Sequence, residues 1–408
     1  MMGEILFLAH RVPWPPNRGD KIRSHHFLQK LMDRAPVHVA CFAEDEGEKQ
    51  AGWERKSELA SSKIVLRTKP QWLGGVEAIL SGKPVSLTCF DNAEIRAFVA
   101  RVIGTRPIDC IFVFSGQMAQ YIPIDFAGRV VMDFGDVDSA KFESYAEEGT
   151  GPMAWINRRE GRLLSGFEKE IAGRADHALF VSEAEAHLFR QRSGLGDDRV
   201  GAMGNGIDLE FYDAPDVHPA DLGHGGPMIL FTGQMDYQPN VQAVQSFSRQ
   251  VMPAILSRFP EARFAIAGRA PADKVRQLDG KNGTIVVGAV DDIRSWIVAA
   301  EVVVAPLRIA RGIQNKVLEA MAMAKPVVAS GCAAEGIDAI DGEHFLIARS
   351  VDEEASLVCG LLQNSGEARQ LGERAKQLIH ARYSWKRQLA DLPALCGLPT
   401  AVTAGVAA

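Results

Sequence analysis

The residue types best suited to chemistry lie between Arg311 and Ser330, in the order R-G-I-Q-N-K-V-L-E-A-M-A-M-A-K-P-V-V-A-S. A tight loop at Gly312 leads into a helix expected over residues 315–324. The start of such a helix directs free backbone N–H groups and the positive end of its dipole at one point, which suits a phosphate. Lys316 adds a mobile charge, and Glu319 follows where a carboxylate accepts from ribose hydroxyls. An Asn-capped helix with a Lys–Glu pair is the alternative.

A loop rich in cations follows the first expected strand. It reads HRVPWPPNRGDKIR, and its prolines stiffen the approach to a helix that begins near Gly19. Four cations gather at that helix start: Arg11, Arg18, Lys21 and Arg23. Because a helix N-terminus does not itself favour cations, we expect an anion there, with Gly19 and Lys21 among its contacts. A solvated basic loop is the alternative.

Other polar motifs in the first half also follow expected strands. Asp136 and Asp138 form a D-x-D pair that could hold a divalent metal, but a polar role of Asp136 facing a ligand, or a helix cap, is favoured. Ser182 and Glu185 have the spacing of a capping box. Asn205 lies in a Gly–Asn–Gly turn, which suits unusual backbone angles and close approach to a ligand.

The second half repeats the pattern of a glycine at a strand end. Gly233-Gln234 follows one expected strand, Gly268-Arg269 follows the next, and Gly312 follows a third. One such glycine is weak evidence for a phosphate site, whereas three at the ends of strands in one sheet are stronger. Arg269 is a further candidate diphosphate contact.

The elements that must position these motifs are short apolar strands alternating with amphipathic helices. Continuous apolar strands indicate sheets covered on both faces, and the alternation indicates parallel βαβ units. We therefore predict an α/β protein with two doubly wound domains of about six strands each. The expected limits are 1–212 and 228–383 for the domains, 213–227 for a Pro/Gly/Asp-rich linker, 384–396 for a helix that crosses back, and 397–408 for a frayed tail.

Composition narrows the class of protein. A chain of 408 residues favours two domains, and a net charge of −6 argues against a general nucleic-acid binder. The six cysteines have no metal-binding spacing and lie mostly in apolar runs, so reduced, buried thiols are expected. With neither a signal-peptide pattern nor a membrane-spanning run, the expected location is the cytoplasm or the inner face of its membrane.

One basic helix is expected from Trp155 to Ala172. It carries Arg158, Arg159, Arg162 and Lys169. Either these cations form a solvated face, or they contact an anionic membrane or a lipid-linked acceptor.

Taken together, the motifs resemble the GT-B glycosyltransferases of family 4 (group 1), and most closely the sugar transferases associated with the PEP-CTERM/exosortase exopolysaccharide system. The resemblance runs over roughly residues 4–390, through HRVPWPPNRGDKIRSHHF, DVDS, VSEAEA, NGID, FTGQMDYQPN, IAGRAP and RGIQNKVLEAMAMAKPVVAS. It implies two Rossmann-like domains facing a cleft. It also implies retaining transfer of a sugar from a nucleotide-diphosphate donor to a glycan or lipid-linked acceptor, without a cofactor or required metal.

The resemblance also assigns roles to residues. Glu319 matches the glutamate that binds the nucleotide ribose, and Lys316 and Arg269 lie near the diphosphate. The candidate catalytic residues are Lys316, Arg269 and Asp136, the last as a contact to the sugar or acceptor. The expected donor-binding residues are Gly19, Lys21, Asn205, Gly233, Gln234, Arg269, Arg308, Arg311, Gly312, Asn315, Lys316 and Glu319.

The chain departs from the family in one respect. Many members carry E-x7-E, but Arg311 stands eight positions before Glu319. We assign Arg311, with Arg308, to the diphosphate, although an acidic sugar is a second interpretation. Two other functions stay open at this stage: a sugar-nucleotide epimerase of the same fold, which needs no acceptor, and a non-catalytic member of a polysaccharide assembly complex.

Overall fold

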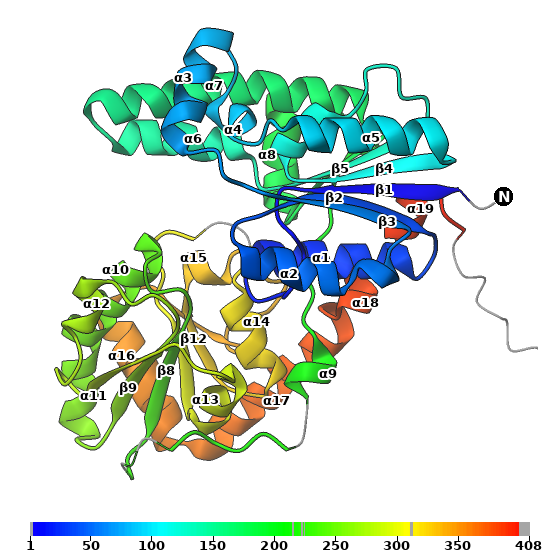
Figure 1. The fold of residues 1–408 in the computed structure, drawn as a ribbon. Helices are drawn as coiled ribbons and strands as arrows, with labels where there is room; N and C mark the ends of the chain where they lie inside the picture. The colour runs from blue at the N-terminus through cyan, green and yellow to red at the C-terminus, as the bar shows by residue number, and fades with distance from the viewer. Residues whose placement is uncertain (1–2, 214–215, 222, 224, 311–312, 400–408) are drawn as a thin grey trace, which may run out of the picture. The chain divides into compact units, whose positions relative to one another are not determined.

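The computed structural model describes residues 3–213, 216–221, 223, 225–310 and 313–399, so the predicted roles of Arg311 and Gly312 lie outside the described residues. The chain divides into two compact units (Figure 1). One comprises Met1–Gly204 with Leu389–Ala408, and the other comprises Asn205–Gln388. The short segment 205–212, which the sequence places in the first domain, therefore belongs to the second unit.

The first unit is built on a sheet of seven strands, all paired in parallel. The strands are β1 (Glu4–Ala9), β2 (Val37–Ala43), β3 (Ser61–Leu66), β4 (Ile108–Phe114), β5 (Arg129–Gly135), β6 (His177–Phe180) and β7 (Val200–Ala202). Their order, β3-β2-β1-β4-β5-β6-β7, reverses direction between β1 and β4. At such a switch point the following loops diverge and leave room for a ligand at the carboxyl ends of the strands.

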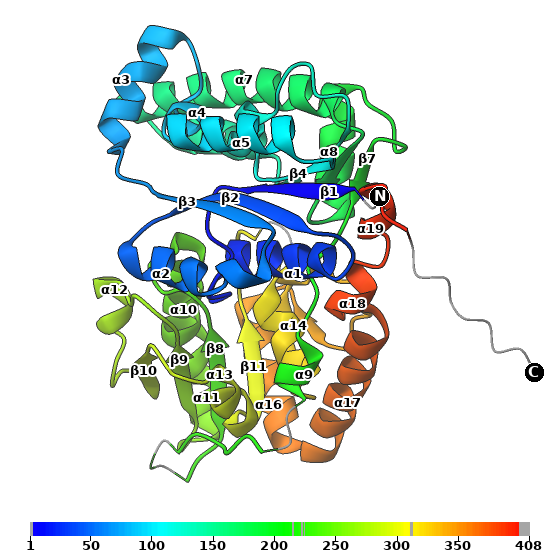
Figure 2. The same ribbon diagram turned by 45° about the vertical axis from the view of Figure 1, so that its right-hand side comes forward.

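Helices cover both faces of this sheet. α1 (Gly19–Met32) and α2 (Glu46–Glu54) lie on one face, and α5 (Ala93–Thr105), α6 (Asp138–Glu148), α7 (Gly151–Arg174) and α8 (Glu183–Ser193) lie on the other (Figures 1 and 2). α3 (Gln71–Ser81) and α4 (Val85–Thr88) join β3 to α5. Every residue of β1 and β2 is buried, which explains their uninterrupted apolar sequences.

The second unit repeats the plan with six parallel strands in the order β10-β9-β8-β11-β12-β13. The strands are β8 (Met228–Thr232), β9 (Arg263–Ala267), β10 (Thr284–Gly288), β11 (Val302–Ala305), β12 (Val327–Ser330) and β13 (Leu346–Ala348). The prediction of two doubly wound α/β units is therefore confirmed.

The helices of the second unit include the one that carries Lys316. They are α9 (Leu209–Tyr212), α10 (Gln238–Ser246), α11 (Met252–Arg258), α12 (Asp273–Arg276), α13 (Ile293–Ala299), α14 (Asn315–Ala322), α15 (Gly331–Ala334), α16 (Val351–Gln363), α17 (Ser365–Arg382) and α18 (Trp385–Gln388). A π-helical turn, η3 (Phe247–Val251), joins α10 to α11. α14 ends two residues before the predicted Ala324, because Ala324 takes a left-handed conformation with φ 54°.

The C-terminal segment returns to the first unit after α18. Instead of the single helix expected over 384–396, the chain forms α18 and a separate short helix, α19 (Leu392–Leu395), which packs against α1. The Arg129 guanidinium also donates to the Leu395 carbonyl at 3.4 Å. Among the described residues, none of the helices combines the length and the apolar character needed to cross a bilayer. All six cysteines are free and, except for the partly exposed Cys332, buried.

Candidate active site

In the second unit, the loops after β8 and β9 meet at two glycines. The Gly233 N–H donates to the Ala267 carbonyl at 3.2 Å, and the Met235 N–H donates to the Arg269 carbonyl at 2.8 Å. A Cβ atom on Gly268 would stand 1.6 Å from the Gly233 oxygen, so only glycine allows this approach. The two loops therefore form one backbone platform at the carboxyl end of the sheet, from which the Arg269 side chain is exposed.

Lys316 lies against this platform from the first turn of α14. Its Nζ donates to Asn240 Oδ1 at 2.7 Å, and Asn240 Nδ2 donates to the Gln234 carbonyl at 2.9 Å. The same Nζ lies 4.2 Å from the centre of the Phe231 ring, a cation–π distance. Asn240 is buried and holds the Lys316 amine beside the Gly233 turn, where an added Cβ would be only 3.2 Å from Nζ.

Burial sets the electrostatics of this cluster. It lowers the pKa of Lys316 to about 7, although the charge of Glu319 opposes the change. Burial likewise raises the pKa of Glu319, against a hydrogen bond from Tyr212 and the charge of Lys316. The Tyr212 hydroxyl, whose own pKa burial and Glu319 raise, stays a donor to that carboxylate. At neutral pH the amine therefore carries only part of its charge, and a phosphate placed on it would draw a proton onto it.

The structure links some of the remaining predicted donor residues to this cluster, but not all of them. Asn205 Nδ2 lies 3.5 Å from Asn315 Oδ1, so the two amides meet where α14 begins. Arg308 Nη2 instead donates to Ser246 Oγ at 3.1 Å and to Gln250 Oε1 at 3.3 Å, on the α10–η3 segment. Among the described residues, these hydrogen bonds of Arg308 do not include Lys316, whose Nζ donates to Asn240.

The Gly–Asn–Gly turn has a structural explanation. A Cβ on Gly206 would stand 2.5 Å from the Trp385 backbone nitrogen, and the Ile207 N–H donates to the Tyr383 carbonyl at 2.6 Å. The close approach expected at this turn is thus a contact with the segment around α18. That contact requires a glycine whether or not a ligand binds.

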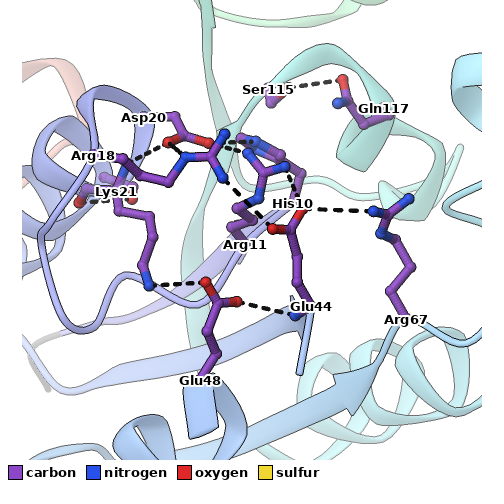
Figure 3. Close-up of polar contacts among 11 residues, drawn as sticks. His10, Arg11, Arg18, Asp20, Lys21, Glu44, Glu48, Arg67, Ser115 and Gln117 are labelled. Carbon is purple, nitrogen blue, oxygen red and sulfur yellow. Dashed lines mark hydrogen bonds and ion pairs between the residues drawn. The ribbon is translucent and has the colours of Figure 1, made fainter. Parts of the chain in front are cut away.

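In the first unit, the cations before and within α1 are engaged by carboxylates (Figure 3). Arg11 pairs with Asp20 and Glu44, and Arg18 Nε lies 3.0 Å from Asp20 Oδ1. The Lys21 side chain is fully buried, and its Nζ donates to Glu48 Oε1 at 3.1 Å. Lys21 therefore does not face an anion at the helix start, and its predicted donor contact is corrected.

Arg23 is directed into the same unit. It is 4% exposed, and its Nε and Nη2 donate to the two oxygens of the fully buried Asp133 at 2.8 and 3.0 Å. Gly19 differs from these residues, because a Cβ there would meet no atom within 4 Å. The N-terminus of α1 is therefore sterically open at Gly19, whose donor contact stays a prediction, while the four cations form internal ion pairs.

His10 lies beside this charged network at the end of β1 (Figure 3). Its ring stacks on Phe114 with centroids 5.8 Å apart, and its Nε2 lies 3.3 Å from Asp20 Oδ2. Burial alone would raise the pKa of Asp20, but His10, Arg11 and Arg18 outweigh it and hold that pKa low. His10 Nδ1 is buried and has no hydrogen-bond partner among the described residues.

The D-x-D segment serves the packing of α6 as well as exposing Asp136. Ser139 donates to Glu168 through N–H at 3.0 Å and Oγ at 2.6 Å. The Val137 N–H donates to Glu185 Oε2 at 2.8 Å, and Ser182 Oγ caps α8 as its spacing predicts. Within the described ranges, no three or more His, Cys, Asp or Glu side chains are grouped to hold a metal ion.

Comparison with known proteins decides the family. The model of the family described as Glycosyl transferases group 1 matches residues 226–364. The phosphatidyl-myo-inositol mannosyltransferase of Mycolicibacterium smegmatis is 30% identical over 311 residues, which is 67% of this chain and 78% of that protein. The chain belongs to the group 1 glycosyltransferases. A protein of the same name from Propionibacterium freudenreichii is 26% identical, and the match covers 60% of each chain.

Solved structures agree on the fold of this glycosyltransferase. Sucrose-phosphate synthase from Thermosynechococcus elongatus has a TM-score of 0.69 at 17% identity, with 97% of this chain and 98% of that chain covered. The Anabaena protein Alr3699/HepE, solved in complex with UDP and glucose, has a TM-score of 0.68 at 15% identity, with 97% and 100% covered. These are GT-B neighbours, and at this identity they show the fold alone.

Three residues of this glycosyltransferase make contacts that the sequence did not predict. Asn240 stands 76 positions from Lys316, and no local spacing links the two. Tyr212 lies at the predicted end of the first domain, yet its hydroxyl forms a hydrogen bond with the Glu319 carboxylate. His10 opens the HRVPWPP motif, but only the fold shows that its Nε2 lies 3.3 Å from Asp20 and that its ring stacks on Phe114.

Proposed function

We propose that this glycosyltransferase transfers a sugar from a nucleotide-diphosphate sugar to a glycan or lipid-linked acceptor, with retention at the anomeric carbon. The observation that carries the proposal is the cluster of Lys316, Asn240 and the Gly233–Gln234 turn beside Glu319. It combines an amine, backbone groups and the Glu319 carboxylate, to which we assign the nucleotide ribose, at the carboxyl end of one sheet, where α/β proteins bind nucleotides. The resemblance of the motifs favours exopolysaccharide synthesis as its setting.

In the proposed reaction, the glycosidic bond breaks and negative charge builds on the departing diphosphate. Lys316 and Arg269, with the N-terminal N–H groups of α14, stabilise that charge, which is the kind of electrostatic contribution on which enzymes commonly rely. In a retaining transfer the leaving phosphate itself takes the acceptor's proton, so no protein base is required. Asp136 is proposed as a contact to the sugar or acceptor, and neither a metal nor a resident cofactor is part of the proposal.

A lipid-linked acceptor is favoured by the two relatives above, which are named phosphatidyl-myo-inositol mannosyltransferases. Peripheral contact with a membrane accords with such an acceptor. The nucleotide base, the sugar and the acceptor are to be identified by experiment.

The first test is thermal stabilisation of the purified protein by UDP, GDP, ADP and TDP and their sugars. A ligand at about a hundred times its Kd adds roughly 2.7 kcal/mol of stability, which is readily measured. We expect a shift with one nucleotide family, and its loss in Lys316→Ala and Glu319→Ala. Since a charge-assisted hydrogen bond contributes about 1.5–3 kcal/mol, Lys316→Ala should slow transfer at least roughly tenfold.

Three results would contradict the proposal. If no nucleotide stabilises the protein, a non-catalytic role is favoured. If the donor sugar changes without an acceptor, the enzyme is an epimerase. If Lys316→Ala transfers sugar at the normal rate, Lys316 has no place in the site.

A further inference from the structure

α3 of the first unit has the reverse of the usual helix pattern, with its large apolar side chains in solvent. Trp72, Leu73, Val76, Ile79 and Leu80 are exposed by 70, 36, 47, 66 and 83%. The residues that the helix buries are small: Gly74 and Ala78. A surface helix normally turns its apolar stripe inward. Here it cannot turn over, because a Cβ at Gly74 would already stand 2.4 Å from Cys89 Sγ.

The N-terminal turns of α7 extend this apolar surface. Met153, Trp155 and Ile156 are exposed by 63, 57 and 40%. The Arg159 guanidinium ties α7 to the end of α3, since Nη2 donates to the Ala78 carbonyl at 2.7 Å and to the Lys83 carbonyl at 3.2 Å. Both ribbon views show α3 beside α7 at the edge of the helical layer (Figures 1 and 2). We call these eight residues of α3 and α7 the apolar surface.

The helical segments that carry the apolar surface expose more positive than negative charge, although the neighbouring Glu147 near the end of α6 is exposed as well. Of the carboxylates on α3 and on residues 151–162 of α7, Glu77 is paired with Lys69 at 2.6 Å, and Glu160 is buried, where it accepts from Ser86. The exposed cations Arg158 and Arg162 follow Trp155 by three and seven positions, which places them on the same face of α7. The exposed charge of these segments is therefore basic.

We infer that the apolar surface is a membrane-docking site, which inserts α3 and the start of α7 into the interface of an anionic bilayer. Two tryptophans, several aliphatic side chains and flanking arginines are the composition of a helix that lies in the headgroup region. The basic rim matches anionic lipid headgroups, each nearby cation adding attraction. A soluble partner would need no such excess of positive charge at the edge of the patch.

A cavity lies beside this surface. Ile156 also lines a hollow of about 300 Å³, whose walls include Arg67, Phe90, Gln117 and Phe142. The aromatic wall continues to His10, because the Phe90 ring lies 6.2 Å from that imidazole. The docking site rests on the proposed function in one respect: a lipid-borne acceptor supplies the reason for the enzyme to meet a bilayer, with this cavity opening beside it.

The test is flotation of the full-length protein with vesicles of phosphatidylcholine alone or of phosphatidylcholine mixed with phosphatidylglycerol. We expect the protein to bind the anionic vesicles and to bind neutral ones several-fold less. The variant Trp72→Ala/Leu80→Ala should lower the partition coefficient at least roughly tenfold, because two large apolar side chains no longer leave water. The matched control is Trp53→Ala/Ile124→Ala, which removes similarly exposed side chains (53 and 82%) elsewhere on the same unit.

A second pair of variants tests the basic rim. Arg158→Glu/Arg162→Glu should abolish the preference for anionic vesicles, whereas Lys274→Glu/Arg369→Glu, with the same change in net charge in the second unit, should keep it. Thermal unfolding checks that each variant is folded; the substituted side chains are exposed, so little change is expected.

Several outcomes would overturn the inference. They are absence of wild-type flotation on both vesicles, equal loss in the Trp53→Ala/Ile124→Ala control, and a wild-type dimer that Trp72→Ala/Leu80→Ala converts to a monomer in sedimentation equilibrium. The proposed function fails separately: nucleotide-induced thermal shifts should be the same in wild type and in Trp72→Ala/Leu80→Ala. Loss of those shifts from all proteins, with flotation intact, would refute the transferase chemistry and leave the docking site standing.

Discussion

Nucleotide-sugar binding should weaken as pH rises from 6 to 8, because Lys316 must gain a proton to meet the diphosphate. The pKa of the unliganded amine is about 7 as a result of burial beside Phe231 and Asn240. A bound diphosphate raises that pKa by placing negative charge against Nζ. Since the bound form has the higher pKa, binding takes up a proton, and affinity is greatest below pH 7 and falls above it.

The size of the effect follows from the fraction of protonated amine. With the free pKa near 7, about nine-tenths of the amine is charged at pH 6 and about one-tenth at pH 8. If the bound amine stays charged throughout, Kd should rise roughly tenfold across this range, or about 1.4 kcal/mol. Nucleotide sugars are the proper ligands, because their diphosphate is esterified at both ends and does not titrate here.

Isothermal titration calorimetry measures both Kd and proton uptake, the latter by repeating the titration in buffers of different ionisation enthalpy. The matched control is Lys316→Arg, whose guanidinium stays charged and should give a Kd that changes little with pH. A flat wild-type Kd with no proton uptake would refute the assignment. A slope that persists in Lys316→Arg would transfer the titration to another group, such as Glu319.

Three further substitutions test the contacts around Lys316 and at the start of α1. Gly268→Ala should lower the free energy of unfolding by about 3 kcal/mol or more, since its Cβ would fall 1.6 Å from the Gly233 oxygen; near-wild-type stability in urea would mean that these loops separate easily. Gly19→Ala should leave stability within about 0.5 kcal/mol of wild type, because its Cβ meets no protein atom, yet slow sugar transfer; unchanged turnover would remove this helix start from the reaction. Asn240→Asp should raise the pKa of Lys316 by placing a carboxylate on Nζ, and so move the fall in nucleotide affinity to higher pH; an unmoved pH profile would show that the contact is not maintained in solution.

The sequence predicted the sheets better than the side-chain partners within the site. Continuous apolar runs sufficed for the strands, and the glycine turns at Gly233 and Gly268 do mark the platform beside Lys316. The sequence did not predict that Asn240 is the partner of Lys316, because Asn240 comes from the helix after another strand. Pairing across parallel strands depends on crossover connections, and those leave no short-range spacing in the sequence.

The basic loop shows a different kind of error, for which a signal was present. Lys21, Ser24, Leu28 and Leu31 recur at helical spacing and form part of the buried stripe of α1. That periodicity places Lys21 inward, whereas counting charges near a helix start ignores direction. The carboxylates that engage the cations come mainly from other segments, since Arg23 and Asp133 are 110 positions apart. Charge can be read from a sequence, but compensation of charge requires the fold.

The ion pairs of the basic loop affect how the enzyme binds an anionic donor. The four cations of the first unit's basic loop are balanced by Asp20, Glu44, Glu48 and Asp133, and the amine of Lys316 is only partly charged near neutral pH. Little of the positive charge of these five residues is therefore available to attract a diphosphate from a distance. Besides the exposed Arg269, recognition comes from backbone N–H groups at short range and from a proton gained on binding, and these two act only once the phosphates are in place. An enzyme organised in this way stabilises charge where the leaving group develops it, which favours the departing diphosphate over the intact donor.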